Sequence, residues 1–196
     1  MTTSLDMTAA DMQVAGEPQA AGEPKATGEP KVQGPPTLSS FAHVSLPCRN
    51  LEEGMRFYVH VLGGELMFNV GDYAAIRIAG VQFGLGTEGC TFVEPRMEYP
   101  HVAFHVEAAE MMHMRRWLTR CGIPVSNLWT RTGVEALMFF RDPSKNLIEL
   151  YCKTGMPGAD RFPRGNARGG DAVNTEAIYY TEWSLPPEHP QAARKA

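Results

Sequence analysis

The stretch Phe139–Cys152, FFRDPSKNLIELYC, consists of two apolar runs separated by a turn. The turn is predicted at Asp142-Pro143-Ser144, because proline fixes its own φ and short polar side chains hydrogen-bond to nearby backbone. The second apolar run is typical of a strand and carries one acid, Glu149, between Ile148 and Leu150. Burying an unpaired carboxylate is costly, so we expect Glu149 to be neutralised, paired or bound to a cation.

The remaining composition restricts the kind of protein. A chain of 196 residues with 43% hydrophobic content has room for one domain, or for two small modules that share a core. The net charge is −4 and Lys and Arg are not clustered, which disfavours nucleic acids and anionic membranes as partners. No apolar run approaches a membrane span, no export signal is visible, and the cysteines form no CxxC pair. We therefore expect a cytoplasmic protein with reduced thiols.

The two ends of the chain differ from its middle. Residues 1–38 contain a Gly-Glu-Pro repeat and few large apolar side chains, so we predict a disordered tail; a spacer is the simplest role, and partner binding stays open. Residues 154–196 are predicted to form an extended arm. Its aromatic residues Tyr179, Tyr180 and Trp183 are expected to pack on the domain or on a second subunit, with a pocket lid as the alternative.

A first supersecondary unit is predicted over residues 40–88. FAHVSL alternates like a half-buried strand and places His43 and Ser45 on one face. A helix is predicted to begin after Asn50, a preferred N-cap residue, and to end at Gly63-Gly64. Three strands are then predicted, at 65–70, 73–78 and 81–85.

The same order recurs over residues 98–153. PHVAFHV predicts a strand that begins at His101, a helix follows and ends at Gly122, and strands are predicted near 125–129, 135–140 and 147–152. His43 precedes Gly64 by 21 residues, as His101 precedes Gly122. This repetition predicts a duplicated βαβββ unit. We expect an α+β domain over residues 39–153, with two paired modules forming one curved sheet around a metal cavity.

The duplication places His43 and His101 at matching positions, and pairing of the modules would bring both to Glu149. Two imidazoles and one carboxylate form a facial triad for a divalent metal that leaves other positions open to substrate. Taken singly, a histidine on a strand is more often a core residue, and a glutamate at a strand end is more often solvated. The shared position of the two histidines is what favours a metal site.

With these residues in place, the chain resembles the vicinal oxygen chelate superfamily, which includes glyoxalase, fosfomycin and bleomycin resistance proteins, methylmalonyl-CoA epimerase and extradiol ring-cleaving dioxygenases. The segments that carry the resemblance are FAHVSLPCRNLEEGMRFYVHVLGGEL, YPHVAFHV and FFRDPSKNLIELY. The resemblance covers about residues 40–153. It implies that His43, His101 and Glu149 bind the metal, with Fe(II) or Mn(II) preferred, and that the protein is a homodimer.

Some positions depart from family patterns. Glyoxalase-like and epimerase-like members use a fourth ligand from the last strand of the first module, and alignment of VQFGL with NLIEL puts Gly84 there, with Gln82 as the nearest substitute. A metal site with three protein ligands matches the dioxygenases and the fosfomycin-resistance transferases better. The dioxygenases, however, carry a catalytic tyrosine where this chain has Phe139, and their additional histidine has no counterpart here.

Other residues are candidates for catalysis or substrate binding. His105 shares a strand face with His101 but lies about 13 Å along the strand, so it is a candidate proton shuttle and not a second ligand; the alternative is a packed core histidine. Tyr99, beside the same strand, is a weaker catalytic candidate. Ser45, Trp129 and Arg131 are candidates for substrate binding, although a surface hairpin also explains the last two.

The expected function is that of a metal-dependent oxidoreductase resembling extradiol dioxygenases, acting on a small aromatic or vicinally oxygenated substrate. A glyoxalase-like lyase or isomerase and a fosfomycin-resistance-like thiol transferase are alternatives. A third possibility is a protein of the bleomycin-resistance kind, which sequesters a ligand without catalysis.

Overall fold

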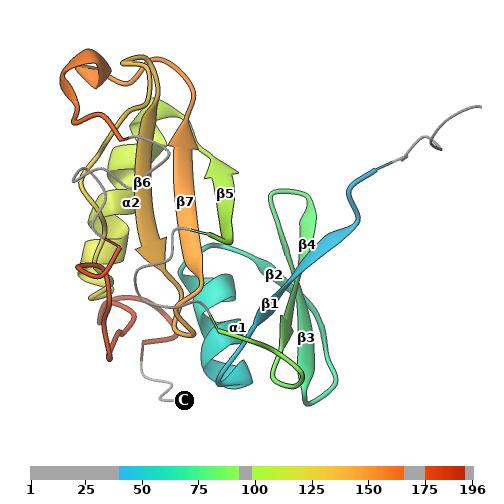
Figure 1. Cartoon of the computed structure of the whole chain (residues 1–196). Helices are drawn as coiled ribbons and strands as arrows, with labels where there is room; N and C mark the ends of the chain where they lie inside the picture. Colours follow the sequence, from blue (N-terminus) through green and yellow to red (C-terminus); the bar gives the residue numbers. More distant parts are fainter. Residues whose placement is uncertain (1–39, 93–98, 166–174, 193–196) are drawn as a thin grey trace, which may run out of the picture. The chain divides into compact units, whose positions relative to one another are not determined.

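The computed structural model describes residues 40–92, 99–165 and 175–192 (Figure 1). The predicted Gly-Glu-Pro tail lies outside these residues. The elements of the first module are β1 (His43–Pro47), α1 (Leu51–His60), β2 (Glu65–Asn69), β3 (Tyr73–Ile78) and β4 (Val81–Gly86). Those of the second module are β5 (His101–His105), α2 (Ala108–Arg120), β6 (Ala136–Arg141) and β7 (Leu147–Cys152), followed by a 3-10 turn at Ala159–Arg161. The α+β class and the paired βαβββ modules are confirmed.

Backbone hydrogen bonds divide the strands into two sheets, with orders β1-β4-β3-β2 and β5-β7-β6. In each sheet the first strand of the module is parallel to the last one, and the preceding strand is antiparallel to it. We expected one continuous curved sheet. The described strands form two instead, because β1 and β5 are both edge strands and do not pair with each other. Each edge therefore presents backbone groups that another strand can pair with.

The strand expected near 125–129 is reduced to two isolated bridges to β6. Pro124 precedes this segment and has no N–H group to donate. The Ser126 hydroxyl then accepts the Phe139 N–H at 2.8 Å. In a regular strand ladder a backbone carbonyl would be the acceptor of this N–H. The second sheet consequently has three strands where the first has four.

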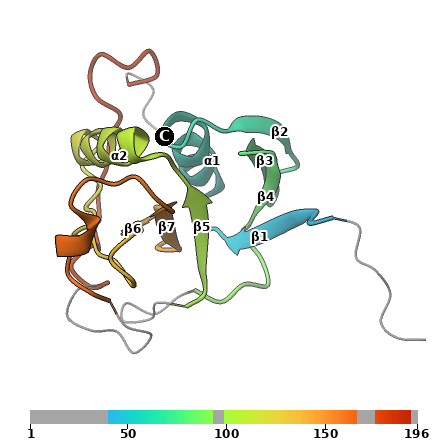
Figure 2. The ribbon, with the colours of Figure 1, turned by 90° about the horizontal axis from the view of Figure 1, so that it is seen from above.

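Both helices form where the sequence predicted them. The Asn50 side chain accepts the Glu53 N–H at 3.0 Å and caps α1, as expected of this residue type. Gly63 and Gly122 follow the two helices with φ values of 71° and 75°, a conformation that glycine adopts without strain. The end of α2 approaches the end of α1 (Figure 2), and there the Trp117 indole N–H donates to the Val61 carbonyl just beyond α1 at 3.0 Å.

The turn between β6 and β7 joins the two modules. Buried Asp142 accepts the Tyr58 hydroxyl of α1 at 3.0 Å and the Asn146 side-chain amide at 2.7 Å. Asn146 also donates to the Pro47 carbonyl at the end of β1, at 2.8 Å. Ser144 accepts the Arg49 N–H at 2.9 Å. Burial raises the pKa of Asp142 to about 6, against the hydrogen bonds from Asn146 and Tyr58, which lower it.

One hydrophobic core extends through both modules. Its most buried members include Phe57, Tyr58, Phe83, Met138, Phe140, Ile148 and Leu150. The four cysteines are unpaired, as predicted, and Cys48, Cys121 and Cys152 are buried. In the part of the chain described here, no helix has both the length and the apolar character needed to cross a membrane.

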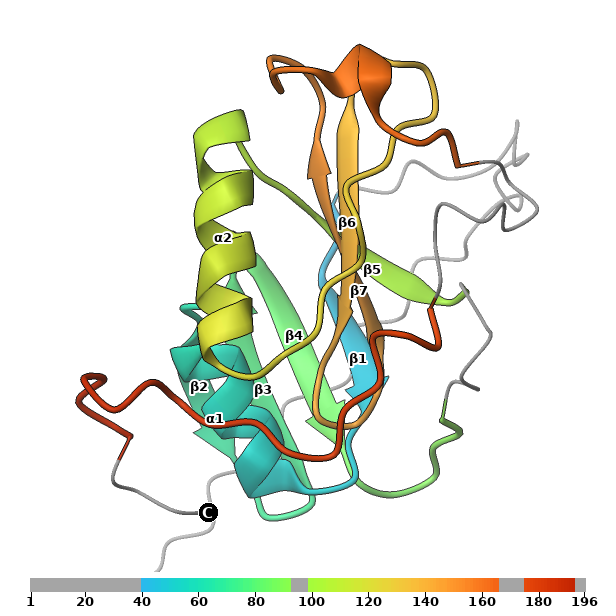
Figure 3. The same cartoon turned by 90° about the vertical axis from the view of Figure 1, so that its left-hand side faces the viewer.

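The described part of the C-terminal arm packs on the domain, which is the first of the three placements that we considered. Trp183 contacts the Phe57 ring edge-on at 5.7 Å and donates its indole N–H to Glu53 of α1 at 2.8 Å. Tyr180 donates to the Arg141 carbonyl at 2.9 Å. Figure 3 shows this segment passing from the β6 and β7 side of the molecule to α1. The arm thus fastens the second sheet to the helix of the first module.

Candidate metal centre

The second sheet brings His101 and Glu149 together. Glu149 lies in β7, between Ala103 of β5 and Phe139 of β6, and its residue exposure is 2%. His101 Nε2 is 3.2 Å from Glu149 Oε2. That oxygen is buried and receives no hydrogen bond from the described residues, so the close pair lacks the angles of a hydrogen bond. A buried carboxylate oxygen in this state is expensive unless a cation satisfies it.

The separation of these two atoms suits a divalent metal. Imidazole nitrogen and carboxylate oxygen bind such ions at roughly 2.0–2.2 Å. At tetrahedral or octahedral angles, two ligands at that distance lie roughly 2.8–3.6 Å apart, and the observed 3.2 Å falls in that range. The orphaned oxygen and the donor types therefore fit a metal held by His101 and Glu149.

The third predicted ligand is not brought to this pair within one chain. His43 is exposed at the start of β1, where it lies opposite Gln82 of β4. Among the described residues, no three His, Cys, Asp or Glu side chains are grouped so that they could hold a metal. The structure thus brings together two of the three predicted ligands. His43 lies on the other sheet, on the face that carries Ser45 and Gly84, which we call the open face of the first module.

Aromatic rings surround His101. The Tyr99 ring lies 5.2 Å from the imidazole, and the Phe139 ring contacts it edge-on at 5.3 Å. Trp129 lies behind Phe139 at 5.8 Å and is 5% exposed, so it is part of the floor of the site and not of a surface hairpin. These rings restrict the movement of the imidazole and keep water away from one side of it.

Arg131 lies beside the buried acid. Its guanidinium lies 3.7 Å from Glu149 Oε2 and 5.1 Å from the Trp129 ring, and its side chain is 49% exposed. The loop that carries it is held by Glu135, which accepts the backbone N–H groups of Arg131 and Thr132 at 2.6 and 2.9 Å. Burial opposes ionisation of Glu135, but these bonds and the Thr132 hydroxyl outweigh it and lower its pKa to about 2. A half-exposed guanidinium on a loop whose backbone is held in this way is suited to binding an anion.

His105, the predicted proton shuttle, is not brought to the acid. It lies opposite Tyr151 at the far end of β5, with its ring 6.5 Å from the tyrosine ring, and it is exposed.

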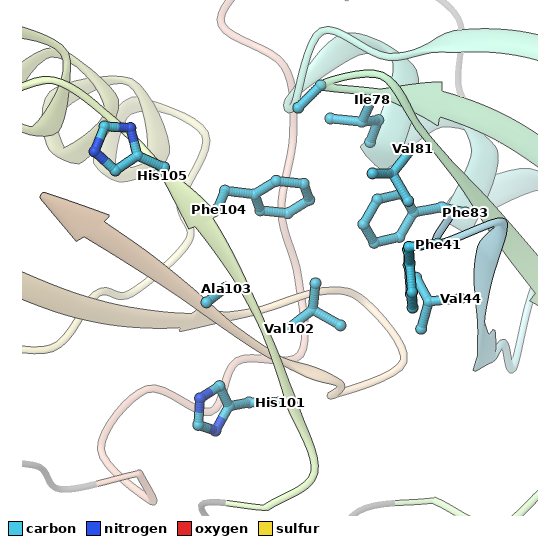
Figure 4. Close-up of a pocket in the computed structure, with 11 residues that line it drawn as sticks. Phe41, Val44, Ile78, Val81, Phe83, His101, Val102, Ala103, Phe104 and His105 are labelled. Atoms are coloured by element: carbon cyan, nitrogen blue, oxygen red, sulfur yellow. The ribbon is translucent and has the colours of Figure 1, made fainter. Parts of the chain in front are cut away.

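A pocket of about 450 Å³ lies between the two modules. Figure 4 shows its apolar walls, formed by Val44 and Phe83 on one side and by Val102 and Phe104 on the other. His101 points away from these walls. His101 lines the same pocket, but since neighbouring residues of a strand point to opposite faces, its imidazole lies on the face of β5 opposite to the Val102 and Phe104 side chains.

Residues 40–150 match the family described as the Glyoxalase/Bleomycin resistance protein/Dioxygenase superfamily. The chain belongs to this superfamily. The resemblance inferred from the sequence motifs is therefore confirmed.

Solved structures with the superfamily fold are similar to this one. The fosfomycin resistance protein FosX from Listeria monocytogenes is 21% identical, with a TM-score of 0.54 over 60% of this chain and 94% of that chain. FosX from Mesorhizobium loti is 16% identical, with a TM-score of 0.50 over 62% and 96% of the two chains. A glyoxalase/bleomycin resistance protein/dioxygenase from Alicyclobacillus acidocaldarius is 24% identical, with a TM-score of 0.50 over 59% and 92%. At these identities the similarity shows a shared fold.

The strand registers confirm that Gly84 is the counterpart of Glu149. In the first module Gly84 of β4 lies between Ser45 of β1 and Ala75 of β3, as Glu149 lies between Ala103 and Phe139. Gln82, the substitute that we considered for a fourth ligand, lies opposite His43. It is two residues before Gly84 on β4 and therefore on the same face of the sheet.

Sequence reasoning missed Tyr73, whose hydroxyl occupies the space above Gly84. A glycine inside a strand often marks a close approach by another group, and this was the signal in the sequence that could have revealed it.

Proposed function

We propose that the chain is a metal-dependent enzyme that binds one divalent ion, Mn(II) or Fe(II), and acts on a small anion with two vicinal oxygens. The observation that carries the proposal is the buried Glu149 oxygen, which lacks a hydrogen bond and lies 3.2 Å from His101 Nε2. Membership of a superfamily that includes metal-dependent enzymes supports it.

His43 completes the metal site in the proposal, and a second copy of the chain supplies it. The described residues of one chain provide two ligands. β1 and β5 are both edge strands, and His43 on β1 is exposed. A twofold axis that brings β1 of each copy to β5 of the other would place His43 of the partner subunit at His101 and Glu149, twice per dimer. The proposed unit is therefore a homodimer.

The residues around the pair define what the site would bind. A divalent ion there would act as a Lewis acid toward two substrate oxygens. Arg131 would hold an anionic group of the substrate, since it is the half-exposed cation beside Glu149. The Trp129 and Phe139 rings would exclude water from the inner side of the site.

Metal-assisted chemistry of the fosfomycin-resistance kind is the first candidate reaction. One FosX structure from Listeria monocytogenes contains Mn(II) and 1S,2S-dihydroxypropylphosphonic acid, a small anion with two vicinal oxygens. Arg131 makes the present site suitable for such a molecule. Phe139, where ring-cleaving dioxygenases carry tyrosine, removes one of the groups that the oxidative reaction uses.

Extradiol-type oxidation of an aromatic substrate is the second candidate. The observation that favours it is the Tyr99 ring beside His101, because this ring is exposed and offers a face against which a planar substrate can pack.

The test begins with metal binding to the full chain, measured by titration with Mn(II) and with Fe(II) under anaerobic conditions. We expect one ion per chain, with binding lost in His101→Ala and Glu149→Ala. The loaded protein is then tested with an epoxide-bearing phosphonate, with water or a thiol as nucleophile, and with catechols while oxygen uptake is recorded. Absence of ion binding by the wild-type chain, or binding as tight as that of the wild type in both variants, would contradict the proposal. Tight ligand binding without any turnover would instead indicate a sequestering protein.

A further inference from the structure

The open face of the first module carries two hydroxyl groups at the position that matches the metal-binding acid. Gly84 is the register counterpart of Glu149, and Ser45 is the counterpart of Ala103. Where the second module has a carboxylate and a methyl group, the first has an empty position flanked by a serine.

Tyr73 fills the empty position. A Cβ atom built at Gly84 would lie 2.7 Å from Tyr73 Cζ, closer still to the Tyr73 hydroxyl oxygen, and 2.6 Å from Ser45 Oγ. Both hydroxyl oxygens therefore lie against the backbone of residue 84. No side chain larger than hydrogen fits there unless Tyr73 moves and the Ser45 hydroxyl rotates away, which is a direct physical reason for glycine at this position.

The two hydroxyls are available to a ligand. Tyr73 is half-buried, with its ring 6.0 Å from the Phe68 ring, and Ser45 is exposed. In the described part of the chain, neither hydroxyl takes part in a hydrogen bond with a protein group. His43 and Ser45 are two residues apart on β1 and hence on the same face of the sheet. The two hydroxyls and the proposed third metal ligand thus belong to one surface.

We propose that Tyr73 binds the substrate at the metal site, with Ser45 beside it, in place of a fourth protein ligand. This inference rests on the proposed function, because His43 brings the hydroxyl pair to the metal of the partner subunit. Two hydroxyl donors beside a coordination position that no protein ligand occupies would bind an anionic oxygen of the substrate. The substrate class is therefore a vicinally oxygenated molecule with one anionic oxygen at Tyr73 and a second anionic group at Arg131.

The first test uses Mn(II) alone and asks whether position 84 faces the metal. In Tyr73→Ala/Gly84→Glu the tyrosine is removed and a carboxylate is installed at the register counterpart of Glu149. We expect this variant to bind Mn(II) roughly tenfold or more tightly than Tyr73→Ala, because it gains a ligand.

The matched control is Tyr73→Ala/Gly86→Glu. It carries the same acid on the same face of β4, two residues beyond position 84. A Cβ at Gly86 meets Tyr73 Cδ2 at 3.8 Å, so the position has room. We expect no gain in Mn(II) affinity from this control. Equal affinities of the two double variants, with normal binding by the wild type, would overturn the inference and leave the proposed function intact. Failure of the wild type to bind Mn(II) would remove both.

The second test measures binding of 1S,2S-dihydroxypropylphosphonic acid to the Mn(II)-loaded protein. Tyr73→Phe is expected to weaken binding roughly tenfold or more, as for loss of a hydrogen bond to a charged group, with Mn(II) affinity and thermal stability unchanged. Tyr180→Phe is the control with the opposite signature: it removes a hydroxyl that donates to the Arg141 carbonyl, so stability should fall and ligand affinity should not. Unchanged affinity in Tyr73→Phe would contradict the role of the hydroxyl. No binding by the loaded wild type would contradict the substrate class.

Discussion

The two modules have the same strand registers and different chemistry at the centre of their open faces. β1 and β4 meet at Ser45 and Gly84, and β5 and β7 meet at Ala103 and Glu149. Ladder hydrogen bonds between backbones set these registers, so either set of side chains is compatible with them. Duplication of the backbone therefore did not duplicate the site: one module carries the acid and the other carries hydroxyls and a glycine.

The modules also differ in what covers them. Ile178 of the C-terminal arm is buried in a small cluster with Trp129, Phe139 and Leu147 of the second module. In the first module, β2 is exposed along its length, and the exposed large side chains there are Leu66, Met67 and Phe68. The arm supports the floor of the acid-bearing site, whereas the first module keeps its outer strand open.

The largest expected effect comes from removing the acid that distinguishes the modules. Glu149→Ala should weaken Mn(II) binding by roughly a thousandfold, since loss of a direct ligand exceeds the 10- to 100-fold cost of losing a supporting group. The unfolding free energy should not fall in proportion, because a buried oxygen without a hydrogen bond is itself destabilising. Calorimetric Mn(II) titration and urea unfolding measure the two effects.

Glu135→Ala is the matched control for that variant. Glu135 is a second buried acid of the same module, and its partners are the Thr132 side chain and the loop backbone. This variant should lose stability and retain a Mn(II) site. A larger loss of Mn(II) affinity in Glu135→Ala than in Glu149→Ala would disprove the assignment of the ligand.

The covering of the second module predicts a difference in stability. Ile178→Ala should reduce the unfolding free energy by about 2–4 kcal/mol, because it leaves a cavity against Trp129 and Phe139. Leu66→Ala on exposed β2 should change it by less than about 0.5 kcal/mol. Urea denaturation of both variants measures the contrast, and similar values would mean that the arm does not support the site.

The junction between the modules predicts a smaller effect that depends on pH. Burial raises the pKa of Asp142 from its ordinary value of 3.8 to about 6. The folded chain therefore binds a proton at this carboxylate more tightly than the unfolded chain does. The stabilisation that comes from protonated Asp142 is complete below pH 3.8 and is lost as the pH rises through about 6. Tyr58→Phe removes a donor to the ionised carboxylate, so it should cost about 1–2 kcal/mol at pH 7 and less at pH 4. An equal cost at both pH values in urea unfolding would show that Tyr58 does not stabilise the charged form.

The sequence alone predicted the modules and a cluster of His43, His101 and Glu149, of which one chain brings together His101 and Glu149. Repeated spacing between strand, helix and glycine specifies the order of elements, and an acid inside an apolar strand requires a partner. Segment 125–129 was predicted as a strand because its composition is compatible with one, and the effect of the Ser126 hydroxyl depends on tertiary position.

Other features depend on contacts that a linear pattern does not contain. The approach of Tyr73 to Gly84 is a diagonal contact between neighbouring strands, and only a register shows it. The division into two sheets depends on whether β1 and β5 pair, and that choice lies between strands separated by more than 50 residues.

The proposed sharing of one metal site between two copies is tested most directly by subunit complementation. His43→Ala and Glu149→Ala chains are each prepared, unfolded together in equal amounts, refolded, and titrated with Mn(II). Random assortment makes half of the dimers mixed, and each mixed dimer holds one intact site, so we predict about a quarter of the wild-type Mn(II) sites. Each variant refolded alone should have none. Recovery of no sites from the mixture, with a wild-type control that refolds and binds normally, would contradict the shared site and place all ligands within one chain.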